Sequence, residues 1–506
     1  MRLQASDLFY LMPELSLLMA AVLLTVLDLI LPESTSRKRF GWIAAAGVLV
    51  SGAFVVWFMF DIRGNSAEYI VLLAQSYRID QFANSFKLFM LAGTLLVLLM
   101  SMGSLKKEGV EHRGEYYYLM LPATIGGMIM ASSADLITLF IGLELLSITS
   151  YILVGIRKKH LHANEAAFKY VVLGGIATAF ILYGMSFLYG LSGSTNLAHI
   201  NDALQGMDPS WTAIVYISFI LILAGLAFKI AAAPFHAWAP DVYQGAATPV
   251  AAYLAVVSKA AGIAMLLRIA YNAYYDASSG TQPIDDPMFA MIAVIAAAAM
   301  IIGNTAALRQ TNVKRLLALS AVANSGYLLV PVSLQLSPAH ASNFAEIYFY
   351  FVAYLLMNIG AFAVLAAVSH VKGQSGLDSF AGLYYRAPFT AVAMLLFILS
   401  LAGIPISAGF VGKFYILTGA VQMQAYWLAA VMILTSVISY YYYFRIVRQM
   451  FLKTDSSAEK RITLPIPLAA VIWFCAVSTV VLGIFPQWLL RPLADLFQVF
   501  GDLFII

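Results

Sequence analysis

The sequence predicts an all-α polytopic membrane protein with about fourteen transmembrane helices. Of its 506 residues, 62% are hydrophobic and only 11% are charged, whereas a soluble chain carries about 25% charged residues. Apolar stretches long enough to cross a bilayer recur along the whole chain. Lysine and arginine gather in every second connection between these stretches, as in chains that cross a membrane repeatedly.

The apolar stretches follow one another through short connections, so no soluble domain is expected between them. The first one contains Asp7 and Glu14 and lacks a small-residue cleavage site, so we interpret it as a span and not as a signal peptide. The fourteen expected spans lie near residues 8–31, 41–61, 79–103, 117–132, 134–155, 164–190, 211–234, 248–272, 288–308, 313–335, 343–370, 388–421, 425–450 and 463–489.

We expect the spans to form four parts. Residues 1–115 would hold the first three spans, and residues 451–506 the last one. Residues 116–275 (spans 4–8) and 276–450 (spans 9–13) would form two five-helix repeats. An odd number of spans per repeat inverts the second repeat in the membrane, and interrupted spans at matching places are typical of inverted repeats in transporters. Spans 7 and 12 are the two interrupted ones here.

The distribution of basic residues predicts the orientation. Nineteen lysines and arginines fall in the connections that follow odd-numbered spans, and four fall on the opposite side. Basic connections stay on the cytoplasmic side of a membrane. Both termini are therefore expected on the outer side.

Span 7 and the span after it carry the first group of candidate functional residues. The stretch 223–264 contains Lys229, His236 and Lys259, and prolines at 234, 240 and 249 interrupt it. A lysine at the bilayer centre costs roughly 2.5–3.5 kcal/mol on insertion scales and marks a functional site by default. Irregular backbone at that depth must be covered by protein or line a wet cavity. We interpret the stretch as part of an ion path.

Span 12 repeats this pattern with Lys413, which follows Pro405 and several glycines. The acidic partner is Glu144 in span 5. A buried carboxylate and a buried lysine that can approach and separate form a natural proton relay. The simpler interpretation is a structural counter-ion for each lysine, and a hydrogen bond to exposed backbone for His236. Lys87, Lys169 and Arg268 lie nearer span ends, where their long side chains could reach water.

The sequence indicates no cofactor or metal of its own. Cys475 is the single cysteine, which excludes a cysteine-ligated iron–sulfur or zinc site within this chain. The glycine-rich stretches lack a strand–turn–helix context and are not nucleotide-binding loops. No feature indicates a nucleic-acid partner.

Several motifs resemble a known family. KIAAAPFHAWAPDVYQGAATPVAA, DLITLFIGLELLSITSYIL, VKRLLALSAVANSGYLL and GIPISAGFVGKFY resemble the antiporter-like membrane subunits of complex I, the proton-pumping NADH–quinone oxidoreductase. PDVYQG resembles the N-type subunit in particular, the bacterial counterpart of mitochondrial subunit 2. The resemblance covers roughly residues 80–450.

This resemblance implies proton translocation coupled to quinone reduction elsewhere in a complex of a bacterial plasma membrane. Glu144 and Lys229 would be a paired switch, Lys259 the central relay and Lys413 the exit-side lysine, with Lys169 and His236 as further relay candidates. FMN and iron–sulfur clusters would belong to partner subunits. The expected neighbours are an antiporter-like M-type subunit, small K- and J-type subunits, and lipid.

The sequence departs from the family pattern at two places: Ala247 stands where a proline is usual, and Asn324 stands where a histidine is common. The first suggests a looser turn before span 8. The second removes a protonatable group from span 10. Two alternatives remain, a subunit of a multisubunit monovalent cation/proton antiporter and a scaffold that moves no ions. PDVYQG disfavours the first, and three deep lysines disfavour the second.

Overall fold

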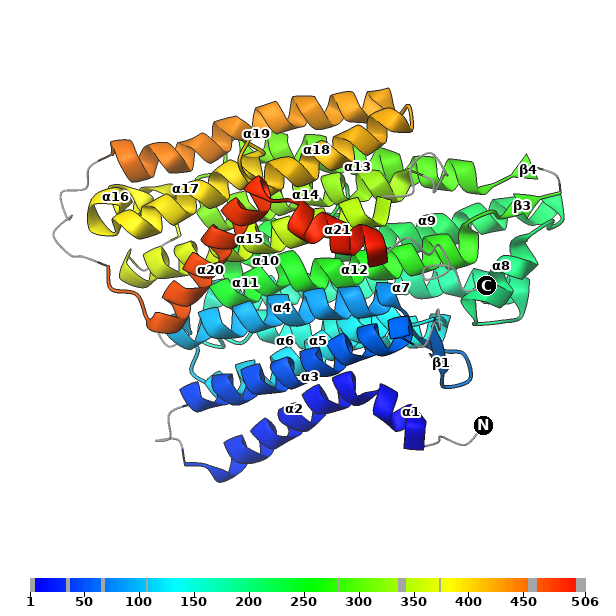
Figure 1. Ribbon diagram of the computed structural model, residues 1–506, viewed down its shortest axis with the longest axis horizontal. Coiled ribbons are helices and arrows are strands. Elements are labelled where there is room, and N and C mark those ends of the chain that lie inside the picture. The colour runs from blue at the N-terminus through cyan, green and yellow to red at the C-terminus, as the bar shows by residue number, and fades with distance from the viewer. Residues whose placement is uncertain are drawn as a thin grey trace.

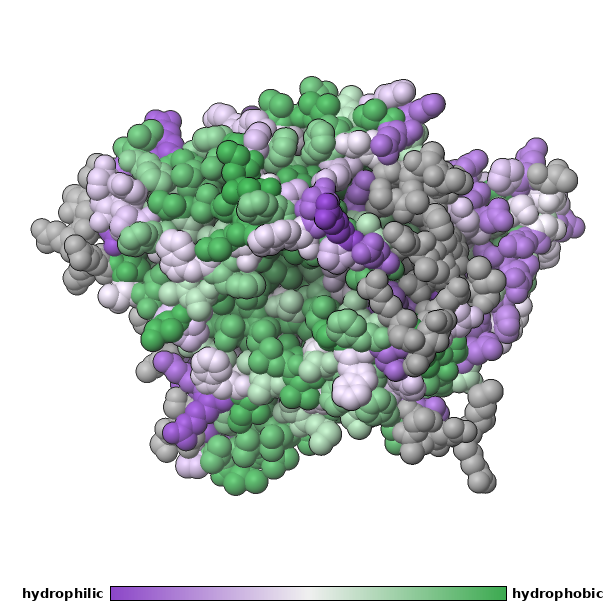
Figure 2. Space-filling view, in the orientation of Figure 1, coloured by the Kyte–Doolittle hydropathy of each residue, from purple (hydrophilic) through white to green (hydrophobic). Residues whose placement is uncertain are grey.

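The computed structural model describes residues 5–32, 37–64, 69–105, 108–280, 282–334, 343–372, 375–453 and 462–496. Its long helices run side by side along the longest axis of the molecule (Figure 1). Hydrophobic residues cover the middle of the visible face, and hydrophilic ones gather toward the two ends of the helices (Figure 2). This is the pattern of a helix bundle whose middle lies in hydrocarbon.

The N-terminal part consists of α1 (Ala5–Tyr10), α2 (Met12–Ile30), α3 (Lys38–Gly64) and α4 (Gln81–Ser104). A short antiparallel hairpin of β1 (Ile70–Leu72) and β2 (Tyr77–Ile79) connects α3 to α4. The Asp80 side chain begins α4, because its carboxylate accepts a hydrogen bond from the Ala83 amide at 2.7 Å.

The middle part begins with α5 (Arg113–Ser132), α6 (Leu136–Val154), α7 (Leu161–Ser192) and α8 (Leu197–Leu204). After a short 3₁₀ turn (Pro209–Trp211) come α9 (Thr212–Lys229), α10 (Trp238–Gly245) and α11 (Thr248–Tyr253). The helix continues through a π-helical turn (Leu254–Ser258) into α12 (Lys259–Ile269) and a second π-helical turn (Ala270–Tyr274). This run is buried along its whole length.

The C-terminal half begins with a hairpin of β3 (Ser278–Ser279) and β4 (Gln282–Pro283), followed by α13 (Asp285–Ala307), α14 (Val313–Ser333) and α15 (Asn343–Lys372). A 3₁₀ turn (Leu377–Phe380) and α16 (Leu383–Arg386) lead to α17 (Pro388–Ala402) and α18 (Ala408–Gln422). The chain continues through α19 (Tyr426–Leu452), α20 (Ile466–Ile484) and α21 (Gln487–Leu496).

Twelve helical stretches of the described chain are long and apolar enough to cross a membrane, and the prediction of an all-α polytopic membrane protein is confirmed. The two remaining expected spans correspond to α5 and to the pair α17–α18. The α5 helix contains Pro122 and charged residues in its first turn, and α17 and α18 have 15 residues each. The two inverted repeats and the four-part division remain predictions.

The connections that the sequence assigns to one side of the membrane meet in the structure. On the side with few basic residues, Ala134 donates a main-chain hydrogen bond to Ser76, and Leu136 donates one to Thr195. Both hairpins lie at this end of the bundle (Figure 1). At the opposite end, five basic-side connections line one cavity, described below.

The structure contradicts the expectation that Lys87 and Arg268 reach water. Both side chains are buried. The Lys87 amino group lies 2.9 Å from the Glu14 carboxylate on α2, and the Arg268 guanidinium donates to both carboxylate oxygens of Asp80 at 2.8 and 2.7 Å. These carboxylates neutralise the cations inside the protein, so the side chains need not extend to the membrane surface.

Candidate functional site

The first interruption separates α9 from α10 directly after Lys229. Ala231 has a positive φ of 56°, which ends the regular helix. The last turn of α9 does not lack hydrogen-bond donors, because the Phe228 carbonyl accepts from the Trp238 indole at 3.0 Å and the Ala227 carbonyl accepts from the Ala232 amide at 2.7 Å. The irregular segment is therefore held in place by the protein.

Lys229 extends from this interruption toward α6. Its amino group donates to the Ser147 hydroxyl at 2.9 Å, and its aliphatic stem packs against Gly262 of α12, where a β-carbon would lie 3.3 Å from Lys229 Cγ. Glu144 lies one helical turn before Ser147 on α6. No ion pair joins Glu144 to Lys229 among the described residues, and one carboxylate oxygen of Glu144 is buried without a hydrogen bond. The Lys229 amino group is therefore bonded one helical turn along α6 from Glu144, without pairing with that carboxylate.

Glu144 also lies on the outer surface of α6. It is partly exposed, and it stands in a stripe of exposed isoleucines at positions 137, 141, 148 and 152. A carboxylate in an apolar, membrane-facing stripe is costly unless another group covers it.

Lys259 occupies the centre of the bundle, directly after the first π-helical turn. Its amino group donates to the Ala321 carbonyl and, at 2.6 Å, to the Ser325 hydroxyl, both on α14. Ser325 in turn donates to the Ile230 carbonyl at 2.6 Å, next to Lys229. A single hydroxyl therefore connects the first interruption to the central lysine.

The second interruption separates α17 from α18 and carries Lys413. Gly403 has φ of 81° there, and a β-carbon on it would lie 3.1 Å from Lys413 Cδ. The Lys413 amino group donates to the Leu401 carbonyl in the last turn of α17 at 2.8 Å and lies 4.5 Å from the centre of the Tyr327 ring. A cation beside the C-terminal carbonyls of a helix complements the helix dipole.

Asn324 of α14 belongs to a buried chain of polar side chains. Its side-chain oxygen accepts from the Tyr350 hydroxyl at 2.5 Å, and its amide donates to the Ser320 carbonyl at 2.8 Å. The Ser320 hydroxyl pairs with the Tyr443 hydroxyl at 2.5 Å. Asn324 therefore anchors neighbouring hydroxyls at this place.

The last two candidates lie apart from the buried lysines. His236 is half-buried within the first interruption, and its Nδ1 has no hydrogen-bond partner in the described part of the chain. Lys169 is 39% exposed and pairs with Glu165 and with Asp241, each at 2.7 Å. Asp241 also pairs with Arg315 of α14, so Lys169 belongs to a charged network near the membrane surface.

The hydroxyls that hold the lysines were not predicted from the sequence. Ser147 and Ser325 lie in membrane-spanning helices, where serines usually bond their own helix backbone. Both do so here, to Leu143 and Ala321, in addition to holding a lysine. The sequence does not distinguish the two uses. No group of three or more potential metal ligands occurs in the described part of the chain.

Comparisons with known proteins identify relatives of this chain. A sequence model of the family described as NADH:quinone oxidoreductase/Mrp antiporter, TM matches residues 133–439. An NADH-quinone oxidoreductase subunit N of Paenibacillus sp. (strain JDR-2) is 51% identical over 511 residues, covering 99% of this chain and 98% of the relative. The subunit N of Brevibacillus brevis is 48% identical over 485 residues, covering 95% and 93%.

Solved structures share the fold. A chain of respiratory complex I from Thermus thermophilus with bound aureothin has a TM-score of 0.78 at 30% identity, covering 95% of this chain and 99% of that chain. A chain of the Mrp complex from Dietzia sp. DQ12-45-1b has a TM-score of 0.83 at 21% identity, covering 99% of both chains, and shows the likeness of fold alone. With relatives matched over nearly its full length, this chain belongs to the NADH-quinone oxidoreductase subunit N family, the N-type antiporter-like membrane subunits of complex I.

Proposed function

We propose that this chain translocates protons in the membrane arm of an NADH–quinone oxidoreductase, through a relay of Glu144, Lys229, Lys259 and Lys413. One observation carries the proposal. The three lysines are buried, with 6%, 1% and 8% of their surface exposed, and their amino groups bond to hydroxyl and carbonyl oxygens. None forms an ion pair with a carboxylate within the described residues.

This bonding suits a group that gains and loses a proton. A buried ammonium that is paired with a carboxylate keeps its proton, because loss of the proton would leave the carboxylate charge buried without a partner. An amino group bonded only to neutral oxygens has no such counter-charge. A charge that approaches or leaves therefore decides whether the amino group is protonated.

Movement of Lys229 between Ser147 and Glu144 would supply this changing charge. When the Lys229 amino group meets the Glu144 carboxylate, the pair is neutral to its surroundings, and Lys259 can accept a proton. When Lys229 returns to Ser147, its charge repels a proton on Lys259 toward Lys413. Water near Asn324 would carry the proton past a residue that cannot itself be protonated. His236 and Lys169 would serve at the edges of this path.

The redox chemistry belongs to other subunits in this proposal. FMN and iron–sulfur clusters would reside in partner subunits, and their electron transfer to quinone would drive the lysine movements. The exposed stripe of α6 around Glu144 supports a neighbouring membrane subunit on that face, and the proposed neighbours are an M-type subunit and small K- and J-type subunits, with lipid elsewhere.

We place the chain in a bacterial plasma membrane with both termini on the outer side. The clustering of five basic-side connections around one cavity supports this orientation, because cytoplasmic connections carry the excess of lysine and arginine.

The test uses inverted membrane vesicles that carry Lys229→Ala. NADH-driven quinone reduction and proton uptake should fall together while a native gel shows the intact complex. Lys159→Ala is the matched control, since that lysine is 82% exposed and pairs only with Glu111 among the described residues. Unchanged proton uptake and quinone reduction in Lys229→Ala would refute the relay and favour a scaffold. Unchanged NADH-driven activity with impaired growth in sodium would favour the cation/proton antiporter.

A further inference from the structure

The turn between α10 and α11 is held by three charged side chains from different parts of the chain. It comprises Gly245, Ala246, Ala247 and Thr248, the last being the first residue of α11. Two carbonyls of this turn lie beyond the regular hydrogen bonds of α10, and the Thr248 amide starts α11 without an intrahelical acceptor. Such groups need partners when they are buried.

Each partner is an ionised side chain. The Thr248 amide donates to the Glu108 carboxylate at 2.7 Å, the Arg157 guanidinium donates to the Gly245 carbonyl, and the Lys314 amino group donates to the Ala246 carbonyl at 2.9 Å. Hydrogen bonds that involve an ionised group are roughly twice as strong as neutral ones. We call the three side chains of Glu108, Arg157 and Lys314 the turn clamp.

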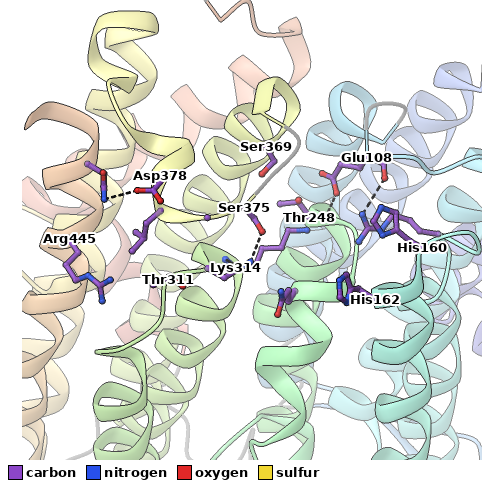
Figure 3. A pocket seen from close by; sticks show the side chains of 16 residues that line it. Glu108, His160, His162, Thr248, Thr311, Lys314, Ser369, Ser375, Asp378 and Arg445 are labelled. Atoms are coloured by element: carbon purple, nitrogen blue, oxygen red, sulfur yellow. Dashed lines mark hydrogen bonds between the residues drawn. The ribbon is translucent and has the colours of Figure 1, made fainter. Parts of the chain in front are cut away.

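The turn clamp forms part of the wall of a cavity of about 740 Å³ at the basic end of the molecule (Figure 3). One buried atom each of Glu108, Arg157 and Thr248 has no hydrogen-bond partner among the described residues: Oε1, Nε and Oγ1 respectively. These unpaired atoms include both donors and acceptors, which suits water better than an anion. Water from the basic side can therefore compete for the bonds of the turn clamp.

Further titratable groups line the cavity beside the turn clamp. The positive charge of the Arg157 guanidinium, together with partial burial, holds the pKa of His160 below its usual value, which favours the neutral imidazole. The cavity is also lined by His162 from α7, Asp378 from the turn after α15, and Arg445 from α19.

The turn clamp shares α14 with the contacts of Lys259. Lys314 lies in the first turn of α14, and Ala321 and Ser325 farther along the same helix hold the Lys259 amino group. The run from α11 to α12 is thus attached to α14 at two points, at its beginning and at its central lysine. Displacement of the turn would shift the whole run, because a helix transmits displacement along its axis.

We propose that Glu108, Arg157 and Lys314 are positioning residues, which hold the run from α11 to α12 so that Lys259 stays bonded to Ser325. This inference rests on the proposed relay function for its effect on pumping, but not for its structural content. It also explains how Ala247 is accommodated: side chains from neighbouring elements fix the turn in which the family pattern has a proline.

A thiol probe tests the structural content. Thr248→Cys places a thiol at the cavity wall, and the native Cys475 is fully buried, so the parent chain provides the background. In inverted vesicles, a membrane-impermeant maleimide should label Thr248→Cys slowly. Adding Lys314→Met should speed the labelling about tenfold, since losing one bond to a charged group is equivalent to at least that factor. Adding Glu108→Gln should speed the labelling less, because the amide oxygen can still accept from the Thr248 amide but without the charge. Arg157→Lys keeps the positive charge but loses the guanidinium that donates to the Gly245 carbonyl. This variant should therefore also speed the labelling.

Proton pumping tests the positioning role. Glu108→Gln and Lys314→Met should lower the protons taken up per NADH oxidised, and Glu108→Asp and Lys314→Arg should restore most of the loss. The double variant should lose less than the product of the single losses, because both act on one turn. Unchanged labelling in all three variants, or losses that multiply independently, would overturn the turn clamp. If labelling changes while Lys229→Ala still pumps, the relay fails and the turn clamp stands.

Discussion

Replacing Asp80 by asparagine should destabilise the protein strongly without touching the relay. Asp80 and Arg268 are both completely buried, and the guanidinium donates to both carboxylate oxygens. Arg268 also donates to the Ala131 carbonyl at 2.9 Å, at the end of α5. The pair thus ties the start of α4 and the end of α5 to α12. Asparagine has the same shape and still caps α4, so the substitution removes little except charge.

The expected cost follows from the arginine that is left behind. Removing one partner of a buried ion pair costs about 3–5 kcal/mol, because the remaining charge is buried without compensation. Arg268→Met should cost less, about 1.5–3 kcal/mol, the range for hydrogen bonds to charged groups. In that variant Asp80 keeps Arg78 at 3.0 Å and the Ala83 amide. The carboxylate substitution should therefore be the more damaging of the two.

The assay is the midpoint temperature at which the assembled complex disappears from native gels. Asp135→Asn is the matched control: Asp135 caps α6 through the Ile137 and Thr138 amides and forms no ion pair in the described chain. Its midpoint should barely move. The order predicted is Asp135→Asn, Arg268→Met, Asp80→Asn from least to most damaging. A midpoint for Asp80→Asn equal to that of the control would refute the view that this pair holds the helices together.

Two further substitutions probe the relay from its edges. Ser147→Ala removes the hydroxyl that holds Lys229. Proton uptake in inverted vesicles should fall, but less than in Lys229→Ala, because the lysine remains and Glu144 lies one helical turn of α6 away from position 147. Lys169→Ala should leave most NADH-driven proton uptake intact, because this lysine is 39% exposed and water can replace it; a loss as large as in Lys229→Ala would make it a central relay residue.

Hydropathy and charge predicted the membrane helices well because both properties are local. A helix in hydrocarbon satisfies its own backbone, so each span can be recognised without knowledge of its neighbours. The sequence also predicts interruptions near Pro234 and Gly403, because proline and glycine disfavour a continuous helix. The short hairpins were not predicted, because β1 (Ile70–Leu72) reads as a brief apolar run whose pairing depends on a turn.

The partners of the buried cations could not be predicted from the sequence. Asp80 is 188 residues away from Arg268, and no periodicity connects two residues that meet only through folding. The expectation that Arg268 extends to the membrane surface was wrong for this reason. The roles of Ser147 and Ser325 were not predicted for a related reason. A serine in a membrane helix can bond its own helix backbone, so its presence in the sequence does not indicate a second bond to a lysine.

The partners divide the six basic residues expected inside spans into two groups. Lys87, Lys169 and Arg268 pair with carboxylates, whereas Lys229, Lys259 and Lys413 bond to hydroxyl and carbonyl oxygens. A carboxylate fixes the charge of its partner, and it links two elements at the cost of desolvating both groups. Neutral oxygens leave the proton free to move. The second interruption contributes to this difference, because it places the Leu401 carbonyl at the end of α17, where Lys413 bonds to it without a counter-charge. The sequence identifies the basic residues that are unusual inside a membrane. Only their bonding partners in the structure distinguish the cations that stabilise the fold from those suited to carry a proton.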